Sequence, residues 1–285
     1  MVVKVEKMSK EFLFTEKDFS YLAQLAGTRA GITLSSGKRE LVYGRLARRL
    51  RKLGLKSFKQ YCDKLKEGDE EELTNFVNAI TTNVTSFFRE NHHFEFLEKN
   101  LLPDLINQQN GMGRPRLRLW SAGCSSGEEP YSIAMVLRES IPDIWRWDAK
   151  ILATDLDSNI VDKASRGIYP LQRIQDVSLA RRKRWFSLGS GNNEGMGKVR
   201  NELKQMITYR QLNLTEEWPM RGPFDAIFCR NVTIYFDKPT RIMLLNRFAN
   251  LLSDGGHLFV GHSESLYGLT DRFRSVGKTI HQKVS

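Results

Sequence analysis

The order of apolar segments after residue 116 constrains the fold of this 285-residue chain more than any other feature. Short runs rich in branched and aromatic side chains alternate there with stretches of helical apolar spacing. We predict strands over 117–122, 150–155, 207–212, 226–229 and 258–260, and helices over 128–138, 158–166 and 238–252. Such alternation is typical of βαβ units, so it indicates an α/β fold with a mostly parallel sheet.

The sequence before and within this alternation differs in style. Four segments near the N-terminus carry apolar residues at helical spacing: 17–26, 38–53, 57–66 and 70–82. Residues 168–206 are polar and hold a glycine-rich loop at 189–195, which predicts a small inserted subdomain of antiparallel strands. We therefore divide the chain into an all-α domain at 1–90, a linker at 91–115 and an α/β domain at 116–285. The linker begins with one more predicted helix, over 91–102, which leads to Pro103.

The composition limits the cellular compartment in which the protein is expected and the metal sites or disulfides that it can contain. No run approaches the ~20 apolar residues that a membrane span needs, so we expect no membrane insertion. The three cysteines form no C-x-x-C pair, and residues 1–7 contain no apolar leader. We therefore expect neither a zinc site nor a disulfide framework, and we expect a cytoplasmic protein.

The net charge of +11 favours an acidic partner. Part of the excess is concentrated between Lys38 and Lys56, where eight basic residues stand against Glu40 alone. Apolar residues recur there every three or four positions, which predicts an amphipathic basic helix over 38–56. Its charged face either binds an acidic surface or is simply solvated.

Small residues follow the first predicted strand of the α/β domain. The run Ser121 to Gly127 lets a ligand approach the backbone, and the next helix directs its N-terminus to the same place. Neither the dinucleotide G-x-G-x-x-G pattern nor a Walker pattern is present, and a tight turn is the plainer alternative. Asp155 ends the second strand, where a carboxylate can accept hydrogen bonds from ribose hydroxyls. Together these features indicate a nucleoside cofactor without a pyrophosphate, which S-adenosylmethionine fits.

Two further segments carry polar residues where a site is expected. Arg230 and Asn231 follow the strand 226–229, at the sheet edge where parallel α/β folds bind ligands. Before the linker, Thr85 and Arg89 are four residues apart and can share a helix face, with Asn83 just ahead of them. Taken alone, this second segment is better explained as an ordinary helix cap followed by a surface arginine.

Four blocks of the chain resemble the chemotaxis receptor methyltransferases, the CheR family. They are Asn83 to Arg89, Trp120 to Ser132, Phe224 to Phe236 and Gly261 to Ser265, in this order. The resemblance implies a class I S-adenosylmethionine methyltransferase with a Rossmann-like sheet, which methylates glutamate side chains of chemoreceptors and releases S-adenosylhomocysteine. It implies cofactor contacts from Asn83, Thr85, Arg89, Glu128, Asp155, Asn213, Leu214, Arg230 and Asn231. Arg89 and Tyr235 should lie near the transferred methyl group.

Some details of this resemblance stay open. Either Glu128 or Glu129 can supply the acidic contact. Thr233 departs from the apolar residue that is usual in the family, and we expect no loss of activity from it. We expect no metal site, because the adjacent His92 and His93 should point to different faces, and His262 is interpreted as structural.

The chemistry agrees with this assignment without help from the resemblance. A glutamate carboxylate has a reference pKa of about 4.3, so it is already a nucleophile at neutral pH and needs no general base. Catalysis then rests on holding the reactants in line, which contributes up to roughly 7–11 kcal/mol in favourable cases. Arg89 can orient a carboxylate, and Tyr235 can offer a hydroxyl or a ring face.

Two other functions share the cofactor fold. A nucleic-acid methyltransferase would suit the net charge, but neither a Pro-Cys pair nor an Asp/Asn-Pro-Pro-aromatic motif is present. A non-catalytic binding module conflicts with the intact Arg89 and Tyr235.

We therefore expect no nucleic-acid partner. We expect a monomer whose basic helix 38–56 docks on the acidic helical region of a receptor. An exposed strand edge of 168–206 could take a receptor's C-terminal peptide, unless it is only a surface hairpin.

Overall fold

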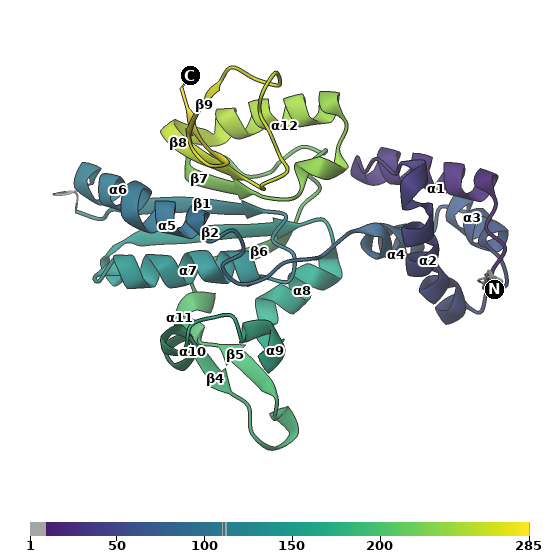
Figure 1. Ribbon diagram of the computed structural model, residues 1–285, viewed down its shortest axis with the longest axis horizontal. Coiled ribbons are helices and arrows are strands. Elements are labelled where there is room, and N and C mark those ends of the chain that lie inside the picture. The colour runs from purple at the N-terminus through teal and green to yellow at the C-terminus, as the bar shows by residue number, and fades with distance from the viewer. Residues whose placement is uncertain (1–9, 110, 112, 285) are drawn as a thin grey trace, which may run out of the picture. The chain divides into compact units, whose positions relative to one another are not determined.

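The computed structural model describes residues 10–109, 111 and 113–284 (Figure 1). Residues 1–9, on which the expectation of no leader depends, lie outside this range. The chain divides into two compact units, Met1–Thr81 and Thr82–Ser285. Residues 82–90, which the sequence placed with the helical domain, therefore belong to the second unit. Within the described residues, no helix combines the length and apolar character needed to cross a membrane.

The first unit is helical, as the spacing of apolar residues predicted. It holds α1 (Glu16–Ala30), the short η1 (Ser36–Lys38), α2 (Arg39–Leu53), α3 (Phe58–Lys66) and α4 (Glu70–Ile80). Thr15 begins α1 with a capping box, in which its hydroxyl accepts from the Asp18 amide and the Asp18 carboxylate accepts in return. Gly54 ends α2 in the left-handed conformation, with a φ of 67° that favours glycine.

The basic helix α2 contributes its apolar face to the core of the first unit. Leu46 and Leu50 are fully buried there. Arg49 forms an ion pair with Glu72 of α4, whose carboxylate also accepts from the Tyr61 hydroxyl at 2.9 Å. Because a buried carboxylate is costly without partners, this three-residue network fixes α2 against α3 and α4.

The second unit is built on a seven-stranded sheet with the order β6-β2-β1-β7-β8-β10-β9. The strands predicted from the sequence are β1 (Arg116–Ala122), β2 (Asp148–Asp155), β6 (Ile207–Gln211), β7 (Phe224–Cys229) and β8 (Leu252–Val260). These five pair in parallel, as expected. The strands β9 (Phe273–Gly277) and β10 (Ile280–Lys283) add an antiparallel edge that the sequence analysis missed.

Alternate residues of the central strands face two separate apolar layers. On β7, Ala226 and Phe228 join the layer that contains α7 (Glu128–Ser140), while Ile227 and Cys229 join the layer beneath α12 (Lys238–Leu251). Figure 1 shows α7 and α12 on opposite faces of the sheet. The predicted helices α7 and α12 thus cover the sheet, and α8 (Ser158–Arg166) follows β2.

The stretch 91–115 was predicted as a linker that begins with a helix over 91–102, and its helical part extends further, to Gln108. It holds α5 (His92–Phe96), a π-helical turn η2 (Leu97–Leu101) and α6 (Leu102–Gln108). Phe94, Leu97 and Leu101 are buried in the same layer as α7. Because these side chains belong to the core, the helical part of this stretch is a structural layer of the second unit and not a connection.

Residues 168–206 form the small antiparallel subdomain that the sequence predicted. Its sheet has the order β3-β5-β4, from the strands β3 (Ile168–Pro170), β5 (Met196–Val199) and β4 (Phe186–Leu188). Between the strands lie α9 (Leu171–Ile174), α10 (Leu179–Trp185) and η4 (Gly191–Asn193), and α11 (Asn201–Lys204) leads into β6. The chain thus leaves the large sheet after α8 and returns to it at β6, so the insertion preserves the parallel topology.

Candidate active site

The strand order reverses between β1 and β7, which makes this place a topological switch point. The loops that follow these two strands are in contact. The strand order runs one way through β2 and β6 and the other way through β8. Ligands in open α/β sheets bind beyond the carboxyl ends of the strands at such a point. Gly123, in the loop after β1, has a φ of 84°, and a Cβ there would lie 2.3 Å from Cγ2 of Val232. Only glycine therefore allows both the turn and the close approach of the two loops.

Asp155 ends β2 and organises the loop after β1. Its carboxylate accepts from the Ser125 amide at 2.8 Å and from the Asp157 amide at 3.0 Å. Burial raises the pKa of Asp155 to about 6, although these amide donors oppose the shift. Asp157 is the residue that caps α8, accepting from the amides of Asn159 and Ile160. Asp155 is thus left in the position predicted for a ligand carboxylate.

Residues 83–89 are not helical, so Thr85 and Arg89 do not share the helix face that their spacing allowed. The segment crosses the carboxyl edge of the sheet from β2 to β7. The Asn83 side-chain amide donates to the Asp157 carboxylate at 3.0 Å. The Phe88 amide donates to the Ser132 hydroxyl of α7 at 3.0 Å, and the Arg89 carbonyl accepts from Arg230. These three bonds bring a segment from distant sequence alongside Asp155 and Arg230. Thr85 lies in this segment and is partly buried.

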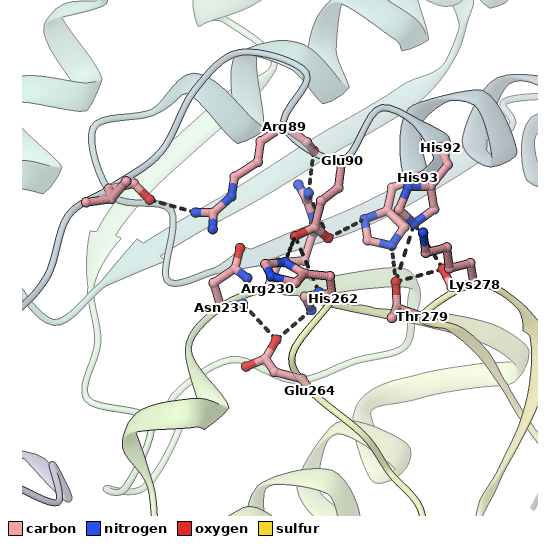
Figure 2. A network of polar contacts seen from close by, with 12 residues as sticks. Arg89, Glu90, His92, His93, Arg230, Asn231, His262, Glu264, Lys278 and Thr279 are labelled. Atoms are coloured by element: carbon pink, nitrogen blue, oxygen red, sulfur yellow. Dashed lines mark hydrogen bonds and ion pairs between the residues drawn. The ribbon is translucent and has the colours of Figure 1, made fainter. Parts of the chain in front are cut away.

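Arg230 is the buried cation of this edge. Its side chain is only 3% exposed, and its guanidinium donates to Glu129 at 2.9 Å. A second contact joins it to Glu90 at 3.4 Å (Figure 2). The Phe94 ring lies 5.7 Å from the guanidinium carbon. Two carboxylates on opposite sides therefore fix the guanidinium.

The two adjacent glutamates at the start of α7 face different partners. Glu128 is fully buried and pairs with Arg173 of α9, and it also accepts from the Ser126 hydroxyl at 2.6 Å. Glu129 accepts from the Ser121 hydroxyl at 2.6 Å and from Arg230. Burial raises the pKa of Glu129 against the lowering effect of Arg230. Glu129 is thus the residue on the Arg230 side, and Glu128 lies against the inserted subdomain.

Glu264 holds the loop after β7, a role that the sequence analysis did not assign. Its buried carboxylate accepts from the backbone amides of Asn231, Val232 and Thr233, at 2.7, 3.0 and 2.6 Å. The Thr233 hydroxyl adds a bond of 2.7 Å. Asn231 has a φ of 60°, a conformation that asparagine tolerates better than most residues. The motif Gly261 to Ser265 contained the signal, because a carboxylate at a strand end can satisfy the amides of a neighbouring loop.

The remaining predicted residues lie around this edge. Tyr235 ends the short helix η5 (Thr233–Tyr235), directly after the loop that Glu264 holds. The Leu212 amide donates to the Asp155 carbonyl at 2.9 Å, which places Asn213 just beyond the end of β6. The Asn213 side chain bonds Thr215 and Glu216, and the Leu214 side chain is buried in the layer beneath α12.

His92 and His93 do not diverge as the sequence led us to expect. Their ring centroids are 4.1 Å apart, and Nε2 of each ring lies within hydrogen-bonding distance of the Thr279 hydroxyl. Burial lowers the pKa of His93 to about 3. Burial alone would raise the pKa of Glu90, but the His262 hydrogen bond and the Arg230 charge outweigh it and lower the pKa to about 2. Adjacency at the start of α5 thus still allows both rings to face one residue.

The groups at this edge fit S-adenosylmethionine. The Ser125 hydroxyl oxygen and Nε of Arg230 are buried and have no protein partner within the described ranges. Asp155 offers a carboxylate suited to ribose hydroxyls. The donor set thus suits a nucleoside that also carries an amino-acid carboxylate.

Comparison with known proteins covers both units. The family model described as "CheR methyltransferase, all-alpha domain" matches residues 17–81, and that described as "CheR methyltransferase, SAM binding domain" matches residues 83–282. "Chemotaxis protein methyltransferase 2" of Pseudomonas aeruginosa is 46% identical over 275 residues, covering 96% of this chain and 95% of that protein. "Chemotaxis protein methyltransferase" of Escherichia coli is 41% identical over 278 residues, covering 96% and 93%.

Proposed function

The chain belongs to the CheR methyltransferase family, and from this premise we propose that it methylates glutamate side chains of chemoreceptors with S-adenosylmethionine. The product on the receptor is a glutamyl methyl ester. The observation that carries the proposal is the meeting of Asp155, Arg230 and residues 83–89 at one edge of the sheet. Cytoplasmic residence and a monomeric state stay predictions from the sequence.

We assign the cofactor contacts to the groups at this edge. Asp155 accepts from the ribose hydroxyls, and Arg230 and Asn231 form the opposite wall. We assign the acidic contact at the start of α7 to Glu129, because Glu128 is already paired with Arg173. Asn83 and Thr85 line the strip between the two walls, and Asn213 with the backbone of Leu214 borders the β6 side.

The reaction needs little from the protein beyond orientation. Bound S-adenosylmethionine supplies a methyl group on a sulfonium, which is a good leaving group. The substrate glutamate, with a reference pKa of about 4.3, is ionised at neutral pH. Arg89 donates to the Val84 carbonyl at 2.8 Å and is partly buried, and we assign it to orienting the incoming carboxylate. Tyr235 stands on the loop held by Glu264, and we place it beside the transferred methyl group.

Receptor recognition is assigned to α2, but not to all its cations. Arg45 donates to the Ile80 carbonyl, Arg49 pairs with Glu72, and Arg51 pairs with Glu11 at 2.6 Å. These three side chains already have partners within the first unit. The exposed side chains of Arg48, Lys52 and Lys56 are therefore the candidates for an acidic receptor helix.

A second contact is proposed at the inserted subdomain. The strand β4 is an edge strand, and its Leu188 side chain is 68% exposed. Beside it lies a hollow of about 270 Å³, lined by residues such as Ser187, Lys198 and Arg200. An extended C-terminal peptide with an acidic residue can add to such an edge through backbone hydrogen bonds. Calorimetric titration with receptor tail peptides tests this contact, and the absence of heat would count against it.

The test of the proposed function is a labelled-methyl transfer assay. The protein is mixed with methyl-labelled S-adenosylmethionine and receptor-rich membranes, and the labelled products are treated with base. We expect label on the receptor band and its release as methanol, because esters hydrolyse in base. Asp155→Asn serves as a control of reduced cofactor binding. Label that resists base, or label on nucleic acid, would overturn the proposal.

A further inference from the structure

Glu90, His92 and His93 form a cluster beside Arg230 that the proposed reaction does not use, and we name it the Glu90 cluster. Figure 2 shows both imidazoles next to Thr279, and the His93 ring also facing Glu90. One ligand atom from each of the three residues lies within 4.8 Å of the others. These atoms are a carboxylate oxygen and two imidazole nitrogens, the ligands that Zn²⁺ and related ions prefer.

The hydrogen bonds of Thr279 determine which nitrogen of His93 carries the proton. The Thr279 hydroxyl donates to the Lys278 carbonyl at 2.7 Å, so its single proton is used there. With the hydroxyl proton used there, we assign a proton to Nε2 of His93, which then donates to the hydroxyl oxygen at 2.8 Å. Nδ1 of a neutral His93 is then left with a lone pair. A metal-binding histidine is commonly held in this way, through the other ring nitrogen.

That lone pair faces a carboxylate and not a donor. Nδ1 of His93 lies 3.8 Å from Oε2 of Glu90, and the His93 side chain is fully buried. Nδ1 has no hydrogen-bond partner in the part of the chain that the structure describes. Two electron-rich atoms that face each other in a buried place are favourable neighbours only with a positive group between them.

The charge around the cluster also favours a cation. Glu90 and Glu129 both flank Arg230, so two carboxylates stand against one guanidinium. His262 covers the open side, with Nδ1 at 2.9 Å from Oε1 of Glu90, and its side chain is 60% exposed. The cluster is therefore buried on the His93 side and open to an entering ion on the His262 side.

We propose that the Glu90 cluster binds a divalent transition-metal ion such as Zn²⁺. Three atoms within 4.8 Å of one another lie at most about 2.8 Å from a common centre, which is 4.8 Å divided by √3. Zinc–ligand distances are about 2.0–2.2 Å, so shifts below about 1 Å close the site. A water molecule or His262 completes the coordination on the open side.

The metal would act on the cofactor site through Glu90. Coordination draws the Glu90 carboxylate away from Arg230 and places a second cation near the guanidinium. Arg230 then loses one of the two partners that fix it beside the proposed cofactor contacts. This consequence rests on the proposed function, and it makes metal and cofactor antagonists, each weakening the binding of the other by the same factor.

The test is a titration of tag-free protein with Zn²⁺ against a chromophoric chelator, repeated with Co²⁺ and its visible absorption. It needs neither cofactor nor receptor, so its outcome is independent of the proposed function. We expect one ion per chain, and we expect Glu90→Gln and His92→Asn each to weaken binding by at least about tenfold. The matched controls are Glu98→Gln, at an exposed glutamate just after α5, and His281→Asn, on β10. Their Zn²⁺ affinity should stay within about twofold of the wild type.

Circular dichroism checks that each variant is folded, and His92→Asn keeps the test decisive if the partly buried Glu90 cannot be changed. Equal affinity in wild type, Glu90→Gln and His92→Asn would overturn the site, as would no binding with Zn²⁺ at about 100 µM. A second titration measures S-adenosylhomocysteine with and without saturating Zn²⁺. We expect at least about fivefold weaker binding with the metal, and an unchanged affinity would overturn the antagonism.

Discussion

The carboxyl edge of the sheet and the basic face of α2 both carry many charged groups, but the protein holds them in opposite ways. At the sheet edge, Asp155, Arg230 and Glu264 are buried, and each has two or more hydrogen-bond partners. On α2, Arg48 and Lys52 project into solvent. The buried groups hold the cofactor site in one geometry before the ligand binds. The exposed cations of α2 instead create a positive electrostatic potential that attracts an acidic partner.

This difference predicts how the two regions respond to substitution. Removing one partner of a buried ion pair costs about 3–5 kcal/mol, because the other charge stays buried without compensation. An exposed pair contributes about 0–1 kcal/mol and is screened by salt. Cofactor binding should thus depend steeply on single residues, and receptor binding should depend weakly on each of several.

The largest effect is expected for Arg230→Gln. It leaves Glu90 and Glu129 facing each other without a cation, so we predict a loss of about 3–5 kcal/mol in the free energy of unfolding. We also predict that S-adenosylhomocysteine binding falls below detection. Urea unfolding and calorimetry measure the two effects. The matched control is Arg173→Gln, which removes the partner of Glu128. This variant should be less stable than the wild type, yet its cofactor affinity should stay within about threefold. If Arg173→Gln and Arg230→Gln lost cofactor affinity equally, the assignment of the acidic contact to Glu129 would be contradicted.

Glu264→Gln should follow. The amide nitrogen that replaces a carboxylate oxygen faces backbone N–H donors, so we expect the free energy of unfolding to fall by about 3 kcal/mol. Thr233→Val is the matched smaller change, removing only the hydroxyl bond to Glu264. It should cost about 1 kcal/mol and leave activity intact. A loss for Thr233→Val as large as for Glu264→Gln would refute the central role of the carboxylate.

The pKa of Asp155 makes cofactor binding depend on pH. Its folded value of about 6 stands above the reference of about 3.9, so its contribution to stability is present at low pH and is lost as pH rises through 6. Ribose hydroxyls donate to the ionised carboxylate of Asp155, so the cofactor affinity should rise as the pH rises through 6. We predict about tenfold weaker S-adenosylhomocysteine binding at pH 5 than at pH 7.5. Asp155→Asn should bind weakly at both, and a pH profile unchanged by this substitution would contradict the prediction.

The smallest effects are expected on α2. Arg48→Glu or Lys52→Glu alone should raise the KM for receptor by about twofold to fivefold at low salt, with less effect in 0.5 M salt. Arg49→Glu is the contrasting change, because it breaks the buried pair with Glu72 and should lower the melting temperature instead. Methylation assays at several salt concentrations separate the two, and a salt-independent effect of Arg48→Glu would argue against docking.

The regular parts of this fold were readable from the sequence because each carries one strong signal. The helices of the first unit show apolar spacing and glycine caps, and β1 and β7 are short apolar runs. The strand β9 was missed because it is a mostly exposed edge strand with no apolar alternation, and β10 was missed because Ile280 is the one buried residue in its four. Within the stretch 91–115, the helix over 91–102 was predicted, whereas its continuation as α6 was not, because a proline usually ends a helix. Here Pro103 stands in the first turn of α6, where its missing N–H donor costs nothing.

The residues at the strand ends of the candidate site were predicted from the sequence, but the residues that hold them in place were not. Asp155 and Arg230 stand where parallel strands end, a position set by the topology. Glu90 and Glu264 act through partners at distant positions, Arg230 and the loop after β7, and spacing along one chain does not reveal such pairs. The choice between Glu128 and Glu129 needed the position of Arg173 in the inserted subdomain.

The most direct test of the contrast between the two regions is one calorimetric titration of S-adenosylhomocysteine, run on two variants under identical conditions. In the triple variant Arg48→Glu, Lys52→Glu and Lys56→Glu, we predict a dissociation constant within about twofold of the wild type, because these exposed charges are screened and take no part in cofactor binding. In Asp155→Asn, we predict binding at least about tenfold weaker. Weakened binding in the triple variant, or unchanged binding in Asp155→Asn, would contradict the account.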